Sequence, residues 1–377
     1  MREFSKLNLI ISQSKMEDEL LPIDWVETKS SIIKIIGVGG GGSNAVNYMS
    51  QHGVCDVDFV VCNTDEQDLK KSPISEKLQI GVLGAGGDPE IGRKAAMDSF
   101  EKIREMLDDG TKIVFLTAGM GGGTGTGATP IIAKIAQDLG ILTVAIVTTP
   151  FEDEGEERVN NAAEGIKELK EFVDALLIIN NEKLIEIYSD LTVDNAFSKA
   201  DDILTVAAKS IAEVITRTGD INLDFADVKK TMFRGGATVI GYATACGVNR
   251  AREAVELALT SPLLNDNDIT GARRILLNIN TSAEKNLLTR ELGEITRYVK
   301  SVAKNAKMIW GKGKDESLGD ALSVTVIASD FSSDFAEYKG DKTKRNGDVP
   351  IIADDTFSRE EIENTPAYER RNIKSIH

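Results

Sequence analysis

The nine residues Gly119–Gly127, GMGGGTGTG, contain six glycines and restrict the possible fold more than any other stretch. They follow Lys112–Ala118, an apolar run short enough to be a buried strand, and precede Ala128–Ala136, which has the pattern of the first turns of a helix. Because glycine has no Cβ, its backbone N–H can approach phosphate oxygens, and a helix start adds free N–H donors. Thr124 and Thr126 add hydroxyl groups. This context predicts a phosphate-binding loop, since a flexible linker would not lie between a buried strand and a helix.

Two further glycine-rich turns occupy similar positions. The β-rich run Ser31–Ile36 ends at Gly37–Val46 (GVGGGGSNAV), and Gly81–Gly87 (GVLGAGG) forms the other turn. The first satisfies the G-x-G-x-x-G pattern of dinucleotide-binding folds at Gly37, Gly39 and Gly42, and Asp65 lies where such folds place a ribose-binding acid. An NAD-dependent oxidoreductase is therefore an alternative on this pattern alone. Three glycine loops exceed what a dinucleotide needs, and no catalytic acid or base for hydride transfer is apparent.

Strands and helices alternate up to Ile179, which predicts a Rossmann-like parallel sheet covered on both faces. Ligand sites in such sheets lie beyond the carboxyl ends of the strands, where the glycine loops are placed. The predicted strands are Ser31–Ile36, Asp58–Asp65, Lys112–Ala118, Ile141–Thr148 and Ala175–Ile179. The predicted helices include Asp88–Gly110, with Asp88 as N-cap and Pro89 following it, and Glu156–Glu171.

The segment Asp194–Thr218 is apolar around most of its circumference, so we expect a long central helix buried between two domains. A smaller α+β domain is predicted after it. Its helices are Phe225–Met232, Asn249–Leu259 and Thr289–Ala303, and its strands are Gly236–Ala245, Ala272–Asn280, Lys307–Gly311 and Leu322–Ala328. The complete predicted organisation is a loose extension (1–29), a nucleotide-binding domain (30–193), the central helix (194–218), the second domain (219–330), a linker (331–363) and a terminal segment (364–377).

The composition of the chain argues against several classes of function. The formal charge of −16 argues against nucleic-acid binding, because an acidic surface repels phosphates. The three cysteines have no C-x-x-C spacing, which favours free thiols in a reducing cytoplasm. Two histidines give little basis for a histidine metal site, and we predict no protein metal site. No run approaches the roughly 20 apolar residues of a membrane span, so no direct membrane insertion is expected.

The run GGGTGTG resembles, almost letter for letter, the signature of the tubulin/FtsZ family of GTPases, and the resemblance covers about residues 30–330. It implies a GTPase that binds GTP or GDP, with Mg²⁺ bound through the nucleotide. It also implies which residues contact the phosphates. They are Gly40, Gly41, Gly42, Ser43 and Asn44 in the first loop, Ala85, Gly86 and Gly87 in the second, and Gly123, Thr124, Gly125 and Thr126 in the third.

The same resemblance implies which residues contact the ribose and the base of the nucleotide. Within TTPFEDEGEER, Glu154 and Arg158 are the expected ribose and nucleotide contacts, while Asn181, Phe197 and Asp201 match the guanine-binding positions. Phe197 can stack on the base, and Asn181 and Asp201 can pair with its polar edge, which would select guanine over adenine. Without the family, Phe197 would be a core residue and Asp201 a solvated helix residue.

The segment Asn222–Val228 (NLDFADV) has two compatible interpretations. From the residues alone a helix start is favoured, with Asp224 as N-cap and Asp227 in the first turn. The family resemblance implies that Asn222, Asp224 and Asp227 are catalytic residues that complete the active site of a neighbouring subunit. Repetition of one head-to-tail contact generates a filament, so the chain itself is the first expected partner. The resemblance also implies that the chain is cytoplasmic and that its filaments form the ring at the bacterial division site.

The terminal cluster TPAYERRNIK resembles the family's tail peptide, so residues 364–373 are expected to bind membrane-tethering and regulatory division proteins. A disordered end with a chance basic pair is the interpretation without the family. A tubulin-like filament protein for plasmid segregation or cell shape is the remaining alternative, and the tail peptide favours cell division over it.

Overall fold

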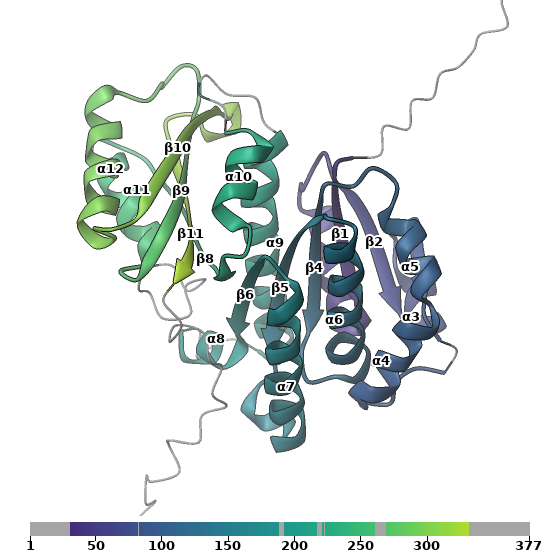
Figure 1. Ribbon diagram of the computed structural model, residues 1–377. Coiled ribbons are helices and arrows are strands. Elements are labelled where there is room, and N and C mark those ends of the chain that lie inside the picture. The colour runs from purple at the N-terminus through teal and green to yellow at the C-terminus, as the bar shows by residue number, and fades with distance from the viewer. Residues whose placement is uncertain are drawn as a thin grey trace, which may run out of the picture. The chain divides into compact units, whose positions relative to one another are not determined.

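The computed structural model describes residues 31–81, 83–187, 192–216, 221, 223–260 and 269–331. The predicted extension and terminal segment, almost all of the predicted linker, and Asn222 lie outside these residues. The described residues belong to one compact unit that contains two sheets (Figure 1).

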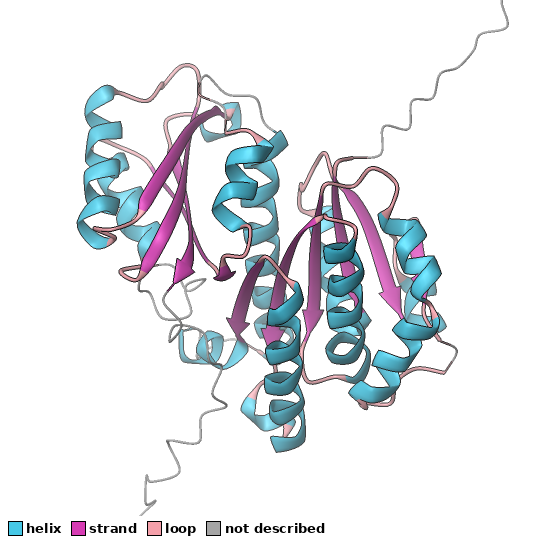
Figure 2. Ribbon diagram, in the orientation of Figure 1, coloured by secondary structure: helices cyan, strands magenta, loops and turns pink. Residues whose placement is uncertain are grey.

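The first sheet has seven strands, all parallel, in the order β3-β2-β1-β4-β5-β6-β7 (Figure 2). The strands are β1 (Ile33–Val38), β2 (Asp58–Asn63), β3 (Glu76–Gln79), β4 (Ile113–Gly119), β5 (Leu142–Thr149), β6 (Ala175–Asn180) and β7 (Gly236–Ala237). The prediction of a parallel α/β sheet is confirmed. The central strands β1, β4 and β5 are buried on both faces almost throughout, as strands covered by helices must be.

The helices of this part are α2 (Gly39–Gln51), α3 (Glu66–Lys71), α4 (Pro89–Asp98), α5 (Phe100–Leu107), α6 (Gly123–Asp138), α7 (Glu156–Phe172) and α8 (Asn181–Ile187), with a short 3₁₀ turn at Glu152–Glu154. Figure 1 shows α6 and α7 in front of the strands, while α9 runs behind them. The predicted single helix 88–110 is wrong in one respect. Ser99 leaves helical geometry (φ −102°, ψ 15°) and separates α4 from α5, although its N–H still donates to Ala95 and Ala96.

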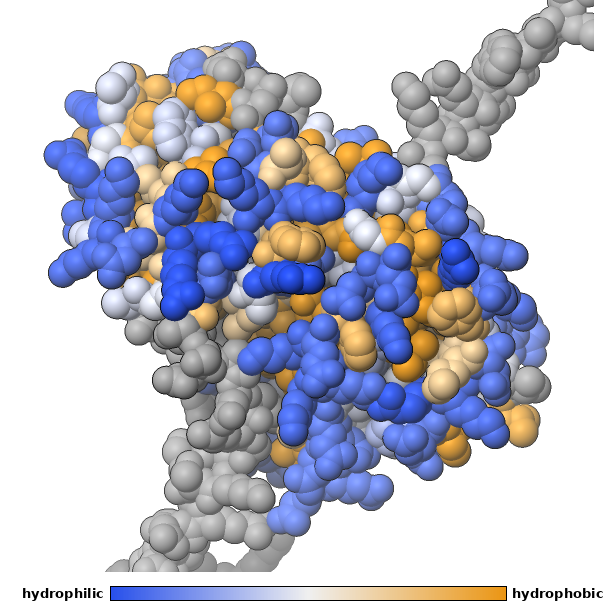
Figure 3. Space-filling model, viewed as in Figure 1, coloured by the Kyte–Doolittle hydropathy of each residue, from blue (hydrophilic) through white to orange (hydrophobic). Residues whose placement is uncertain are grey.

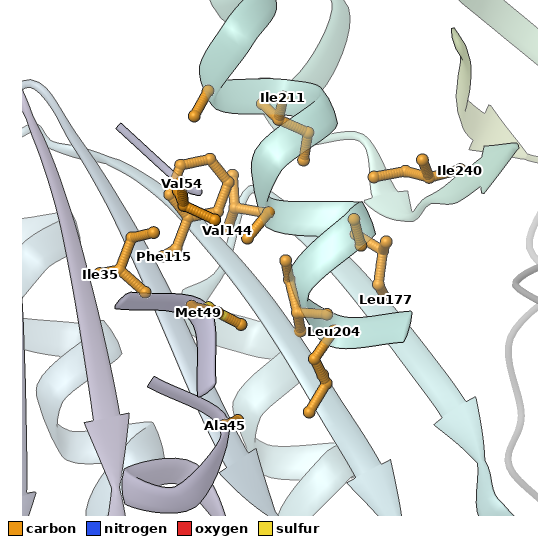
Figure 4. Packing of buried hydrophobic residues seen from close by; sticks show 14 of the residues in the cluster. Ile35, Ala45, Met49, Val54, Phe115, Val144, Leu177, Leu204, Ile211 and Ile240 are labelled. Atoms are coloured by element: carbon orange, nitrogen blue, oxygen red, sulfur yellow. The ribbon is translucent and has the colours of Figure 1, made fainter. Parts of the chain in front are cut away.

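The long helix α9 (Val193–Thr216) has exposed residues in its first turns and is largely buried from Ala200 onward, as the prediction of a buried central helix requires. Leu204 and Ile211 pack against Phe115 and Val144 of the first sheet and belong to the same apolar cluster as Ile240 of the second sheet (Figure 4). Burial of side chains of this size stabilises the fold by roughly 1.5–3 kcal/mol each. The helix therefore packs against residues of both sheets and connects them through one apolar cluster.

The second sheet is mixed, with β9 and β10 parallel and β11 antiparallel to both β9 and β8. Its elements are β8 (Val239–Ala245), β9 (Ala272–Thr281), β10 (Lys307–Lys314) and β11 (Leu322–Phe331), with α10 (Phe225–Met232), α11 (Arg250–Leu259) and α12 (Thr289–Val302) and a 3₁₀ turn at Glu316–Leu318. The predicted strand 236–245 is divided: Gly236–Ala237 pairs with β6 in the first sheet, and only β8 joins the second.

Candidate nucleotide-binding site

A cavity of about 590 Å³ opens beyond the carboxyl ends of the first sheet's strands. The ends of β1, β2, β4 and β5 reach it, as do the first turns of α2, α6 and α9. This is where the glycine loops were predicted to place a ligand. Its volume and its mixed wall of backbone, carboxylate and apolar groups fit a nucleotide better than a small metabolite.

Two of the three glycine runs form the first turns of helices. Helix α2 begins at Gly39 and α6 at Gly123, whereas the sequence predicted that the second of these helices begins at Ala128. Neither N-cap, Val38 nor Gly122, supplies a side-chain hydrogen bond, so the first backbone N–H groups of both helices remain available. Two helix dipoles and two sets of free donors therefore converge on one cavity, an arrangement suited to phosphates.

One backbone turn between β4 and α6 requires glycine. Gly121 has a φ of 99°, and a Cβ there would lie 2.8 Å from the carbonyl oxygen of Arg158. The hydroxyl of Thr126 accepts a hydrogen bond from the Gly121 N–H at 2.8 Å and fixes this turn from behind. Thr126 therefore supports the loop and does not itself line the cavity.

The third glycine run lies against the start of α6, where a Cβ on Gly123 would lie 2.7 Å from the Cβ of Ala85. Ala85, Gly86 and Gly87 line the cavity together with Thr64, whose hydroxyl lies 2.7 Å from that of Thr124. The carboxylates of Asp65 and Asp68 lie along the same wall. Asp65 also caps α3 by accepting from the Gln67 N–H at 2.8 Å, and Asp68 pairs with Lys71 at 3.2 Å. Thr64 and Asp68 were not predicted to line the site, although their position just after β2 is one where such sheets place ligand contacts.

A buried amide and a carboxylate with an altered pKa form the opposite end of the cavity. Asn181 is 4% exposed, and its Oδ1 has no hydrogen-bond partner in the protein. Such an atom needs a donor from a ligand, because an unpaired buried acceptor is unfavourable. Burial, and then the charge of Asp202, raises the pKa of Asp201 to about 6. Phe197 is 45% exposed and meets Phe151 edge to face, with centroids 5.1 Å apart. Its ring is therefore free to stack on a flat ligand.

The side wall is formed where α7 begins. Glu154 accepts from the Phe151 N–H at 3.0 Å and also pairs with Arg158 one turn later in the chain. Both side chains line the cavity beside Pro150. This ion pair places one carboxylate and one guanidinium on the cavity wall.

The structure brings together most of the predicted nucleotide contacts. Those lining the cavity are Gly40, Gly41, Asn44, Ala85, Gly86, Gly87, Gly123, Thr124, Gly125, Glu154, Arg158, Asn181, Phe197 and Asp201. Gly42, Ser43 and Thr126 lie behind its wall. A Cβ on Gly42 would lie 2.2 Å from the Thr117 carbonyl oxygen, so this glycine allows α2 to pack on β4.

The predicted catalytic aspartates lie elsewhere. Asp224 is exposed and caps α10, accepting from the Asp227 N–H at 2.8 Å, as the helix-start interpretation predicted. Neither aspartate lines the cavity of its own chain. Helix α9 enters the cavity at its first turns and is about 36 Å long at ~1.5 Å per residue, and α10 follows its far end.

Hydrogen bonds at the end of α10 place this helix at the amino ends of the first sheet's strands, opposite the cavity. The N–H groups of Arg234 and Gly235 donate to Asp174 at 3.2 and 2.8 Å. Asp174 precedes β6, and the other end of β6 leads to Asn181 in the cavity. The sheet thus separates α10 from the cavity of its own chain.

Among the described residues, no group of three or more His, Cys, Asp or Glu side chains could hold a metal ion. Over the same residues, no helix is long and apolar enough to cross a membrane. The three cysteines are free; Cys62 is buried, and burial raises its pKa to about 12.

Comparisons with known proteins agree with this geometry. Residues 32–189 match the model of the tubulin/FtsZ family GTPase domain, and residues 236–332 match that of the FtsZ family C-terminal domain. The chain is 48% identical to the cell division protein FtsZ of Porphyromonas gingivalis over 92% of its own length and 77% of that protein. It is 47% identical to the FtsZ of Pseudomonas aeruginosa over 80% of its length and 77% of that protein.

Among solved structures, the chain resembles an FtsZ dimer from M. jannaschii with a TM-score of 0.73 and 39% identity, covering 87% of this chain and 92% of that one. The alternative of a dinucleotide-dependent oxidoreductase is therefore wrong, because both matched regions belong to one GTPase family. The chain belongs to the tubulin/FtsZ family, as a member of the FtsZ cell-division GTPases.

Proposed function

We propose that this chain binds GTP in the cavity, assembles head to tail into filaments, and hydrolyses GTP where two subunits meet. The observation that carries the proposal is the separation of Asp224 and Asp227 from the cavity of their own chain. A complete nucleotide cavity at one end and an exposed acidic helix start at the other complement each other between copies. Head-to-tail repetition of such a contact forms a filament.

Within the cavity, each wall acts on one part of the nucleotide. The free N–H groups of α2 and α6 bind the phosphates, and Glu154 and Arg158 bind the ribose side. Asn181 and Asp201 pair with the polar edge of guanine, which satisfies the unpaired Asn181 Oδ1. Phe197 stacks on the face of the base. Together these contacts distinguish guanine from adenine.

The donor set also fits Mg²⁺ bound mainly through phosphates. Asp65 and Asp68 are the carboxylates beside the proposed phosphate end, and Mg²⁺ commonly takes one or two carboxylates, with the remaining ligands from phosphate and water. When bound, the ion neutralises charge on the phosphates. The chain's own residues hold the nucleotide still and keep its terminal phosphate at the open end of the cavity.

Hydrolysis requires a group that orients the attacking water. Asp224 uses one carboxylate oxygen to cap α10, which leaves its second oxygen and the carboxylate of Asp227 for the contact with the next subunit, with Asn222 beside them in the sequence. Hydrolysis is thereby conditional on assembly, and loss of the terminal phosphate weakens the contact that produced it.

The direct test is the GTPase rate per subunit as a function of protein concentration. We expect almost no hydrolysis at low concentration and a steep rise in rate per subunit once filaments form. Light scattering of the same samples measures filament formation. A rate per subunit that does not change with concentration would contradict an active site shared between subunits.

Guanine selectivity is a second expected outcome. GTP and GDP should bind at least 100-fold more tightly than ATP and ADP, since adenine leaves the buried Asn181 and Asp201 without their partners; discrimination of about 10⁴ is reached when a site is built to hydrogen-bond its ligand. Competition of each nucleotide against a fluorescent GDP analogue measures the ratio. Equal displacement by ATP would remove the assignment of these residues to the base.

The pH dependence of binding follows from Asp201. Its pKa is raised to about 6 in the free protein, and accepting two guanine N–H groups requires the ionised form. Affinity for GDP should therefore be full near pH 7.5 and fall as the pH drops through 6, by about tenfold at pH 5. Calorimetric titration of GDP at several pH values measures this.

The matched control for this pH experiment is Asp201→Asn, which does not titrate. The phosphates of GDP titrate over the same range in both proteins, so the difference between the two profiles reports Asp201. Superimposable profiles would mean that Asp201 does not hold the base.

We also propose that residues 364–373 bind membrane-tethering and regulatory proteins and so bring the filament to the division site. The support is the similarity of TPAYERRNIK to the family's tail peptide. Deletion of residues 364–377 should leave GTPase activity and assembly within about twofold, because the residues proposed to bind and hydrolyse GTP all lie within residues 30–330. Sedimentation with a membrane tether should be lost. Loss of hydrolysis in the truncated chain would contradict a separable tail.

A further inference from the structure

Two helices that reach the cavity are connected by a polar contact outside it. Helix α2 presents Gly39, Gly40, Gly41 and Asn44 to the cavity from its first turns, and α9 presents Phe197, Ala200, Asp201 and Leu204. Further along α2, the hydroxyl of Tyr48 donates a hydrogen bond to Asp202 of α9. The first helix holds the proposed phosphate subsite and the second holds the base subsite.

Asp202 is held from two sides. Its Oδ1 accepts from Tyr48, and its Oδ2 lies 3.2 Å from the Lys199 ammonium on its own helix. The hydrogen bond to Asp202, followed by burial, raises the pKa of Tyr48 to about 12, so the phenol stays protonated as a donor at neutral pH. Asp202 does not line the cavity, whereas its neighbour Asp201 does.

The ring of Tyr48 is itself fixed. His52, one turn later, stacks on it with centroids 3.7 Å apart and an interplanar angle of 12°. The His52 Nδ1 also lies 2.8 Å from the Tyr48 carbonyl oxygen. A stacked ring loses little further freedom when its hydroxyl binds Asp202, so the contact between the helices is preorganised.

From this arrangement we infer that Tyr48 is a positioning residue for guanine recognition, acting through Asp202. Consecutive side chains on a helix point about 100° apart. Fixing Asp202 against α2 therefore fixes the rotation of α9 that turns Asp201 into the cavity. The same bond sets the spacing between the base and phosphate subsites, since each helix carries one of them. The inference rests on the proposed role of Asp201 in binding guanine.

The contact has a second effect on the adjacent carboxylate. The charge of Asp202 contributes to the raised pKa of Asp201. The Tyr48 hydroxyl and the Lys199 ammonium partly neutralise the charge of Asp202. This limits how far Asp202 raises the pKa of Asp201, so that Asp201 can still ionise. Loss of the Tyr48 hydroxyl should thus harm base recognition both by geometry and by charge.

The test is Tyr48→Phe, which removes one hydroxyl and keeps the ring that stacks on His52. Affinities for GDP and for IDP, which lacks the exocyclic amine of guanine, are measured by calorimetry at pH 7.5. In the natural chain GDP should bind about tenfold or more tightly than IDP. In Tyr48→Phe the GDP:IDP ratio should shrink by about three- to fivefold, because the lost contacts are those to the base edge.

Two further variants make the result specific. In an Asp201→Asn background, Tyr48→Phe should leave the GDP:IDP ratio unchanged, since the carboxylate that Tyr48 positions through Asp202 is no longer there to accept from both guanine N–H groups. Tyr242→Phe removes a hydroxyl that accepts from Thr244 in the second sheet and should change neither affinity. A Tyr48→Phe protein that binds GDP and IDP equally less well, with an unchanged ratio, would overturn the inference and leave Tyr48 a packing residue.

The two proposals fail differently. If the natural chain does not distinguish GDP from IDP or ADP, the proposed guanine contacts of Asp201 fail. If it distinguishes them and Tyr48→Phe does so equally well, only the positioning role of Tyr48 fails.

Discussion

Asp224→Asn is expected to bind GTP normally and to assemble, yet to hydrolyse GTP about 10²–10⁴-fold more slowly, the usual contribution of a positioned acid or base. Its own cavity is intact because Asp224 does not line it. Asparagine caps a helix about as well as aspartate, so α10 should keep its stability. Filaments of the variant should last longer, because hydrolysis no longer weakens the contacts.

Mixing experiments separate this role from helix capping. The variant is titrated into the natural chain at fixed total protein, and phosphate release is followed. Each variant subunit should disable the cavity that it faces, so activity should fall more steeply than simple dilution predicts. Asp224→Ala also removes the cap and should lose about 1 kcal/mol of stability in addition. Proportional dilution with both variants would leave Asp224 as a cap and nothing more.

Gly127→Ala is expected to destabilise the chain by more than about 3 kcal/mol, beyond the usual range for an added methyl group. A Cβ at this position would lie 1.9 Å from the Pro89 carbonyl oxygen and 2.7 Å from the Arg93 nitrogen. These are backbone atoms of α4, so no side-chain rotation can relieve the contact, and α4 must move away from α6. Urea unfolding and thermal unfolding measure the loss.

Gly122→Ala is the matched control from the same glycine run. It has no atom within 4 Å of the added Cβ, and its φ of −83° suits alanine. Its free energy of unfolding should change by no more than about 1 kcal/mol, because the only cost expected is that alanine is a poorer N-cap of α6 than glycine. Because Gly122 lines the cavity, its methyl group should still weaken GDP binding. If Gly127→Ala unfolds at the same urea concentration as the natural chain, the close packing of α4 on α6 is not as described.

These two glycines illustrate how far the sequence could predict the site. The run Gly119–Gly127 correctly indicated a turn between a strand and a helix, because a buried apolar run and a helical pattern flank it. It could not indicate that Gly127 serves helix packing while Gly122 lines a cavity. Both uses require the same missing Cβ, and only the tertiary arrangement distinguishes them.

The glycines at the starts of α2 and α6 were predicted to lie in turns for a related reason. Glycine is a poor helix former by about 1 kcal/mol relative to alanine, so local propensity places Gly39 and Gly123 in loops. In the fold Gly123 is helical, and Gly39 begins α2 with a φ of 72°, a value that glycine adopts readily; both glycines line the cavity. The two-residue strand β7 was also beyond prediction, because its apolar run continues into β8 and the division depends on pairing with β6.

The distance between the cavity and Asp224 has a consequence for how active sites are counted. A filament of n subunits contains n − 1 contacts and hence, as proposed, n − 1 sites able to hydrolyse GTP. The subunit at one end always presents a cavity that no neighbour has completed, so it retains its GTP. Each filament therefore carries one chemically distinct end. The fraction of subunits able to hydrolyse GTP is smaller in short filaments than in long ones. Filament length itself then sets the turnover rate per subunit.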